Sequence, residues 1–215
     1  MNLYTTLDQT IKKMLINEVS EDQKSILSVL VNFIQQKRAN GEAINLNFIC
    51  THNSRRSQFA QLWAQTAAFY YGIEVNCFSG GVEETAFNKR AVDSVERSGF
   101  KVVKKNRTSG RLHQHGEGNP RYTVSFGEDA QPLVMFSKMF DDASNPSTNF
   151  AAVMTCSHAD ENCPFIPGTE ARIPLLYNDP KEFDGTAQEA EKYDERSMQI
   201  ATELFYVFSC ISNVE

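Results

Sequence analysis

The sequence has no run of 18 or more apolar residues, so it predicts no transmembrane helix. Its five cysteines are irregularly spaced along 215 residues, which is unlike a disulfide scaffold. Residues 1–8 lack the basic-then-apolar layout of a signal peptide. We therefore expect reduced thiols and a cytoplasmic protein with no membrane partner. There is also no basic excess, because the formal net charge is −6, which argues against a nucleic-acid partner.

The segment 48–57 carries the strongest chemical signal. Apolar residues lead directly into Cys50, and after five intervening residues come Arg56 and Ser57. This layout predicts a strand, a tight loop and a helix start, whose backbone N–H groups form an anion-binding nest. Arg56 can hold a tetrahedral oxyanion with two parallel hydrogen bonds, and the same positive field favours a Cys50 thiolate. A thiolate beneath a bound oxyanion is a nucleophile for phosphorus or arsenic, whereas a cysteine that ends an apolar strand can also be a simple core residue.

With Asn53 and Ser54 also in place, the Cys-x5-Arg-Ser motif resembles the low-molecular-weight tyrosine phosphatase superfamily. It is most similar to the thioredoxin-coupled arsenate reductases. The resemblance implies that the oxyanion is bound by Thr51, His52, Asn53, Ser54, Arg55, Arg56 and Ser57. His52 stands where the family usually has glycine, and Arg55 replaces a small or apolar residue and is expected to add charge at the rim.

A second pair of cysteines follows a predicted buried strand at 150–155. Cys156 and Cys163 are separated by six residues, and this pair is similar to the redox pair of the thioredoxin-coupled reductases. The resemblance implies that Cys156 attacks the Cys50 adduct and that Cys163 then forms a disulfide for thioredoxin to reduce. The alternatives are two ordinary cysteines or two zinc ligands, but zinc pairs are usually two to four residues apart. We expect no metal and no cofactor.

The third element is Asp179, which is followed by Pro180 after a strand-like segment at 173–177. Asp-Pro alone is a common turn signal. In the superfamily an Asp-Pro at this place carries the general acid, so the resemblance implies that Asp179 protonates the departing oxygen. Lys181 and Glu182 follow where tyrosine phosphatases place aromatic residues, which disfavours a phosphotyrosine substrate.

The hydrophobic periodicity predicts an α/β fold with an open parallel sheet of about four strands flanked by helices. Cys50, Cys156 and Asp179 all follow predicted strands, and ligands of such sheets bind at the carboxyl ends of strands. We expect an N-terminal helical extension at 1–44 and the α/β domain at 45–215, with a hairpin-like insertion at about 110–149. The expected strands are 45–49, 74–78, 101–103, 151–155 and 173–176, and the expected helices are 5–16, 21–38, 56–71, 87–98 and 187–209.

Three functions fit these observations. The first is reduction of arsenate to arsenite by Cys50, Arg56 and Asp179 with the Cys156/Cys163 relay. The second is hydrolysis of phosphomonoesters through a cysteinyl-phosphate on Cys50, which needs neither of the other two cysteines. The third is a non-catalytic oxyanion-binding protein.

Overall fold

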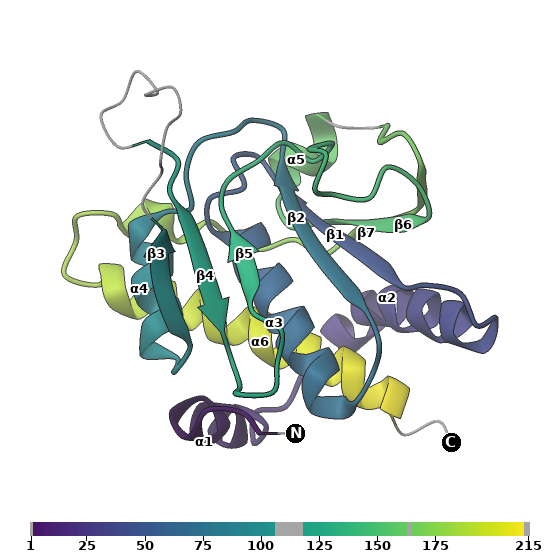
Figure 1. Ribbon diagram of the computed structural model, residues 1–215, viewed down its shortest axis with the longest axis horizontal. Coiled ribbons are helices and arrows are strands. Elements are labelled where there is room, and N and C mark those ends of the chain that lie inside the picture. The colour runs from purple at the N-terminus through teal and green to yellow at the C-terminus, as the bar shows by residue number, and fades with distance from the viewer. Residues whose placement is uncertain (1, 106–117, 163–164, 213–215) are drawn as a thin grey trace.

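The computed structural model describes residues 2–105, 118–162 and 165–212. Its centre is a parallel four-stranded sheet in the order β2-β1-β6-β7 (Figure 1). This sheet agrees with the fold class that the sequence predicts. Its strands are β1 (Asn45–Cys50), β2 (Asn76–Gly81), β6 (Phe150–Met154) and β7 (Thr169–Pro174).

The two inner strands, β1 and β6, are largely buried, and all of β6 and four of the six residues of β1 are apolar. Side chains alternate between the faces, so Leu46 and Phe48 enter the main core. Ile49 and Cys50, at the end of the strand, belong to a second and smaller cluster, together with Cys156. Cys50 and Cys156 therefore lie in the same small buried cluster.

The helices cover the sheet unequally. Helices α3 and α6 form the largest helix–helix contact, and Trp63 of α3 donates a hydrogen bond of 2.9 Å to Ser197 of α6. The short helix α5 contacts β1 and β6, and its Ala159 lies in the smaller cluster. Among the described residues, no helix is long and apolar enough to cross a membrane. The helices are α1 (Thr5–Met14), α2 (Glu21–Ala39), α3 (Arg56–Tyr71), α4 (Lys89–Arg97), α5 (Ser157–Asn162), α6 (Glu189–Ser212) and the 3₁₀ helix η1 (Pro180–Phe183).

A second, antiparallel sheet of three strands lies beside the first (Figure 1). It is formed by β3 (Lys101–Lys105), β4 (Arg121–Ser125) and β5 (Leu133–Met135). The predicted hairpin is confirmed as β4 and β5. The expected strand at 101–103 exists, but it pairs with β4 and not with the parallel sheet, because its partner lies in the insertion.

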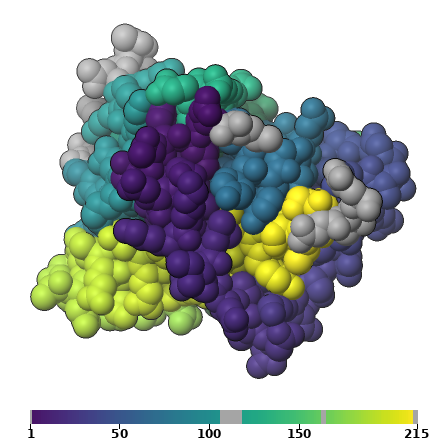
Figure 2. Space-filling model, turned by 90° about the horizontal axis from the view of Figure 1, so that it is seen from below, coloured from purple at the N-terminus to yellow at the C-terminus, as the bar shows by residue number. Residues whose placement is uncertain are grey.

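The N-terminal helices share the main core, since Leu7 of α1 and Leu27 of α2 are fully buried in it. Figure 2 shows the N-terminal segment across the underside of the molecule, beside α6. Helix α2 begins after Ser20, whose hydroxyl accepts a hydrogen bond from the backbone N–H of Gln23, as expected for an N-cap.

Candidate active site

Cys50 ends β1 and is 3% exposed, at the carboxyl edge of the parallel sheet. Its Sγ lies 3.1 Å from Ser57 Oγ, and Asn53 Nδ2 donates a hydrogen bond of 2.9 Å to the same hydroxyl oxygen. Because Ser57 Oγ accepts from Asn53, its own proton is available for the cysteine sulfur. The Ser57 hydroxyl can therefore orient the Cys50 sulfur.

The loop conformation depends on Asn53, whose φ is +46°. Asparagine tolerates this left-handed region better than most residues. His52 has no positive φ, so its bulk causes no backbone strain although glycine is usual there in the family. Asn53 is held by hydrogen bonds from Gln58 Nε2 and from the backbone N–H of Lys138 to its side-chain oxygen, at 3.1 and 3.0 Å.

The segment after β5 braces this loop from outside. The Ser137 hydroxyl donates a hydrogen bond of 2.8 Å to the carbonyl of His52, and Asn119 in turn binds Ser137 at both backbone groups. Gly81 at the end of β2 allows a close approach, since a Cβ there would lie 2.7 Å from the backbone nitrogen of Asn53. The insertion is thus part of the loop's support.

Arg56 begins α3 and points its guanidinium toward the loop after β7. Nη1 donates to the carbonyl of Tyr177 at 3.0 Å, and Nη2 donates to Asp179 Oδ2 at 2.8 Å. Nε is buried and has no hydrogen-bond partner among the described residues. A buried donor without a partner is costly, so a bound oxyanion would stabilise Arg56 by accepting from Nε.

Asp179 is placed by its own local structure. It is the N-cap of η1, where Oδ1 accepts a hydrogen bond of 3.1 Å from the backbone N–H of Lys181. Its side chain is 24% exposed, so solvent reaches the carboxylate beside Arg56. Asp179 and Arg56, for which the sequence predicts the roles of acid and clamp, are therefore in direct contact.

Arg55 is more buried than a rim residue, with a residue exposure of 8%. Its Nε donates a hydrogen bond of 2.7 Å to the Tyr193 hydroxyl, which donates 2.8 Å to Asp184 Oδ1. Arg55 Nε also lies 3.9 Å from Asp179 Oδ1, and Arg55 Nη2 lies 3.6 Å from Asp184 Oδ2. Burial raises the pKa of Tyr193 to about 12, so its hydroxyl remains a donor. Arg55 and Tyr193 therefore fasten the segment after β7 to the Cys50 loop.

Cys156 directly follows β6 and is 1% exposed. Its Sγ lies 3.4 Å from Thr51 Oγ1, and the same hydroxyl lies 3.3 Å from His158 Nδ1. Cys156 thus contacts the Cys50 loop at Thr51, the first residue after Cys50. Cys163 lies outside the described residues.

The other predicted loop residues have different surroundings. The Ser54 hydroxyl donates a hydrogen bond of 2.7 Å to the carbonyl of Ala86, and Nε2 of the half-buried His52 lies 3.3 Å from Glu83 Oε2. No sequence signal indicated Tyr193, and His158 lies between Cys156 and Cys163 without being singled out by that motif. Within the described part of the chain, no group of three His, Cys, Asp or Glu side chains is placed to hold a metal ion.

Comparison with curated proteins finds arsenate reductases. The sequence is 26% identical over 142 residues to that of Halalkalibacterium halodurans, covering 66% of this chain and 78% of the relative. It is 29% identical over 133 residues to that of Brevibacillus brevis, covering 62% and 74%. The chain is related to arsenate reductases. Together with the geometry of Cys50, Arg56 and Asp179, this similarity indicates a cysteine-dependent enzyme.

The comparisons with family models and with solved structures give weaker similarity. No protein-family model matches the sequence. Among solved structures, an arsenate reductase in the phosphate-binding state is 17% identical with a TM-score of 0.46, covering 78% of this chain and 98% of that one. A thioredoxin-dependent arsenate reductase of Corynebacterium glutamicum is 18% identical with a TM-score of 0.41, covering 88% and 71%.

Proposed function

We propose that this chain reduces arsenate to arsenite, with Cys50 as the nucleophile and Cys156 as the second thiol. The observation that carries the proposal is the placement of Cys156, buried against the Cys50 loop at 3.4 Å from Thr51 Oγ1. Hydrolysis of a cysteinyl-phosphate needs no such thiol, whereas reduction needs a second sulfur close to the first.

Arsenate binds to the N–H groups of residues 51–57, and Arg56 Nε supplies a donor that has no partner within the described chain. The Cys50 thiolate, hydrogen-bonded to Ser57, attacks arsenic and forms a sulfur–arsenic bond. Asp179 protonates the departing oxygen, which leaves as water.

The redox step transfers two electrons. The Cys156 thiolate attacks Cys50 Sγ, a sulfur–sulfur bond forms, and the electron pair of the sulfur–arsenic bond goes to arsenic, which leaves as arsenite. Cys163 then attacks Cys156 Sγ, releases the Cys50 thiolate and leaves a Cys156–Cys163 disulfide. Thioredoxin supplies the two electrons that reduce it, and the cytoplasm, where thiols are kept reduced, suits this cycle.

Helix α5 must unwind during this cycle. It comprises the six residues between the two cysteines, and a six-residue helix is about 9 Å long. Disulfide-bonded cysteines usually have Cα atoms roughly 4.4–6.8 Å apart. Closure of the disulfide therefore requires α5 to leave its helical conformation.

The test is NADPH consumption with arsenate, thioredoxin and thioredoxin reductase. We expect arsenate-dependent consumption that disappears in Cys156→Ser. Cys210→Ser, which alters a half-buried cysteine at the end of α6, is the control and keeps the activity.

Phosphomonoester hydrolysis is the second candidate, because Cys50, Ser57, Arg56 and Asp179 form a complete set without either redox cysteine. Hydrolysis of para-nitrophenyl phosphate that survives joint replacement of Cys156 and Cys163 by serine, with no NADPH consumption in the wild type, would favour it.

A further inference from the structure

The sulfur of Cys156 has polar neighbours from two segments of the chain. Thr51 Oγ1 lies 3.4 Å from Cys156 Sγ, and the backbone N–H of Ala159 donates a hydrogen bond of 3.4 Å to the same sulfur. Thr51 Oγ1 also lies 3.3 Å from Nδ1 of His158. Cys156, Thr51 and His158 therefore form a continuous chain of polar atoms that runs from the thiol to an imidazole.

The three side chains differ in their exposure to solvent. Cys156 is 1% exposed and Thr51 is 8% exposed, whereas His158 is an exposed residue of α5. Little water reaches the thiol, so a proton that leaves it needs an acceptor within the protein. His158 lies at the solvent end of the chain and can pass such a proton on to water.

One set of proton positions lets the thiol lose its proton along this chain. The Cys156 S–H donates to Thr51 Oγ1, and the Thr51 hydroxyl donates to a His158 Nδ1 that carries no hydrogen. A thiol with the ordinary pKa of about 8.5 is mostly protonated at neutral pH, and only the thiolate attacks another sulfur. Imidazole is the side chain that exchanges protons in this pH range, which suits it to the end of the chain.

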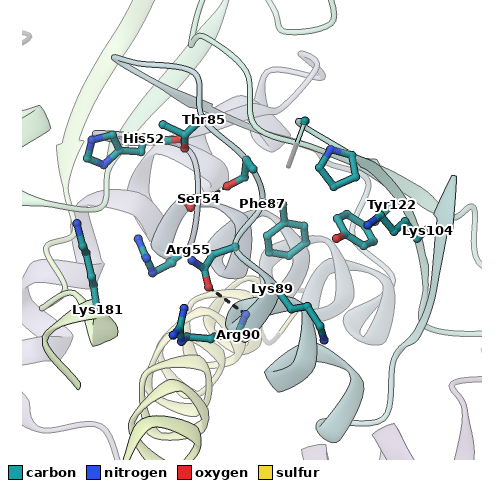
Figure 3. Close-up of a pocket in the computed structure, with 14 residues that line it drawn as sticks. His52, Ser54, Arg55, Thr85, Phe87, Lys89, Arg90, Lys104, Tyr122 and Lys181 are labelled. Carbon is teal, nitrogen blue, oxygen red and sulfur yellow. Dashed lines mark hydrogen bonds between the residues drawn. The ribbon is translucent and has the colours of Figure 1, made fainter. Parts of the chain in front are cut away.

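His52, the histidine of the Cys50 loop, lies in other surroundings. It lines a cavity of about 580 Å³ together with Ser54 and Arg55 (Figure 3). Helix α5 contributes none of the described residues that line this cavity. Of the two histidines in the described part of the chain, His158 is thus the one that is connected to Cys156.

We infer that His158 accepts the Cys156 proton through the Thr51 hydroxyl and so prepares the second thiol for its attack. The thiol proton moves to Thr51 Oγ1 while the original hydroxyl proton moves to His158 Nδ1, which leaves a thiolate and an imidazolium. The thiolate then accepts hydrogen bonds from Thr51 and from the N–H of Ala159. His158 acts through Thr51, so it is a positioning residue. The inference rests on the proposed function, in which Cys156 is the second nucleophile.

The experiment follows formation of the Cys50–Cys156 disulfide in protein that carries Cys163→Ser and Cys210→Ser. One arm uses arsenate in a single turnover. The other arm needs no arsenate, because hydrogen peroxide oxidises the Cys50 thiolate to a sulfenic acid. The Cys156 thiolate attacks that sulfur, a sulfur–sulfur bond forms, and hydroxide leaves. Dimedone competes for the sulfenic acid, so the ratio of disulfide to trapped product measures the rate of attack by Cys156.

His158→Asn keeps a polar side chain beside Thr51 but cannot take up a proton. An ordinary thiol is only a few per cent ionised at neutral pH, so we expect disulfide formation to slow about tenfold in both arms. His158→Ala should show the same loss and regain most of the rate with added imidazole, which can reach the exposed position from solution. Glu161→Gln is the matched control, because it removes an exposed titratable group from the same helix, and it should leave the rate unchanged.

The two arms separate this inference from the proposed function. If the peroxide arm shows the loss and the recovery while arsenate produces no disulfide, the role of His158 stands and arsenate reduction fails. Equal rates for His158→Asn and Glu161→Gln in the peroxide arm would overturn the inference. A loss in His158→Ala that imidazole does not restore, or the absence of any Cys50–Cys156 disulfide in the peroxide arm, would also overturn it.

Discussion

The Asp179 carboxylate accepts a hydrogen bond of 2.8 Å from Arg56 Nη2, which joins the expected acid directly to the expected oxyanion clamp. The two residues lie 123 positions apart in the sequence, and the ends of β1 and β7 bring them to one edge of the sheet. Their contact leads first to a prediction for Asp179.

Replacement of Asp179 by asparagine should remove the proton donor and keep the side-chain volume. General acid catalysis contributes roughly 10²–10⁴-fold, so we expect kcat for phenyl phosphate hydrolysis or arsenate reduction to fall about 100-fold. The fall should be smaller for para-nitrophenyl phosphate, whose leaving group needs less protonation. Equal losses for both phosphate esters would show that Asp179 has another role.

Replacement of Tyr193 by phenylalanine should loosen the segment that carries Asp179. The hydroxyl lies between Arg55 Nε and Asp184 Oδ1, and its loss leaves a largely buried guanidinium without one acceptor. We expect about 1–3 kcal/mol lower unfolding free energy in urea, together with a reduced kcat. Tyr70→Phe, on the face of α3 that packs against α6, is the control. Unchanged stability and kcat in Tyr193→Phe would show that this network does not position Asp179.

Replacement of Gly81 by alanine should displace the Cys50 loop. The added Cβ would lie 2.7 Å from the backbone nitrogen of Asn53 and 2.6 Å from the carbonyl oxygen of Glu83, and backbone atoms cannot yield as flexible side chains do. We expect weak phosphate binding in a chain that still folds. Gly41→Ala is the comparison, because φ is +67° there and no atom lies within 4 Å of the new Cβ. It should lower stability by about 1 kcal/mol and leave phosphate binding intact.

The buried Lys138 leads to a prediction of how the unfolding free energy depends on pH. Burial, with a smaller contribution from the nearby Arg121, lowers the pKa of this lysine from 10.5 to about 8, although Asp142 opposes the shift. The unfolded chain therefore binds more protons between pH 8 and 10.5, so the contribution of Lys138 to stability rises with pH across that window.

Lys138→Met should remove this part of the slope and raise the unfolding free energy near pH 7 by on the order of 3 kcal/mol. The measurement is urea unfolding of both proteins from pH 7 to 10.5. Parallel curves for the two proteins would contradict the assignment.

The sequence predicted the parts of the fold that depend on local patterns. Apolar spacing along 21–38 and the Ser20 cap located α2, because helix periodicity and capping are properties of neighbouring residues. The placement of 101–105 could not be predicted in this way. Its antiparallel partner β4 lies beyond residue 120, and strand propensity alone does not specify the partner.

In the candidate site too, local motifs predict some residues and long-range packing determines others. Cys50, Arg56 and Asp179 stand in short motifs at strand ends, so the sequence located them and the parallel order brought Arg56 to Asp179. The sequence predicts Arg55 at the rim, whereas the structure buries it against Tyr193. This contact could not be predicted, because Tyr193 lies 138 residues away in a helix of ordinary amphipathic pattern. Contacts of that kind depend on how α6 packs against α3, which no local motif encodes.

The most direct test of the proposed relay is disulfide mapping after one exposure to arsenate without thioredoxin. Wild-type protein should contain a Cys156–Cys163 disulfide, and Cys163→Ser should stop at a disulfide between Cys50 and Cys156, each with one equivalent of arsenite released. If all the thiols remain free after arsenate exposure and no arsenite forms, the chain is not an arsenate reductase of this kind.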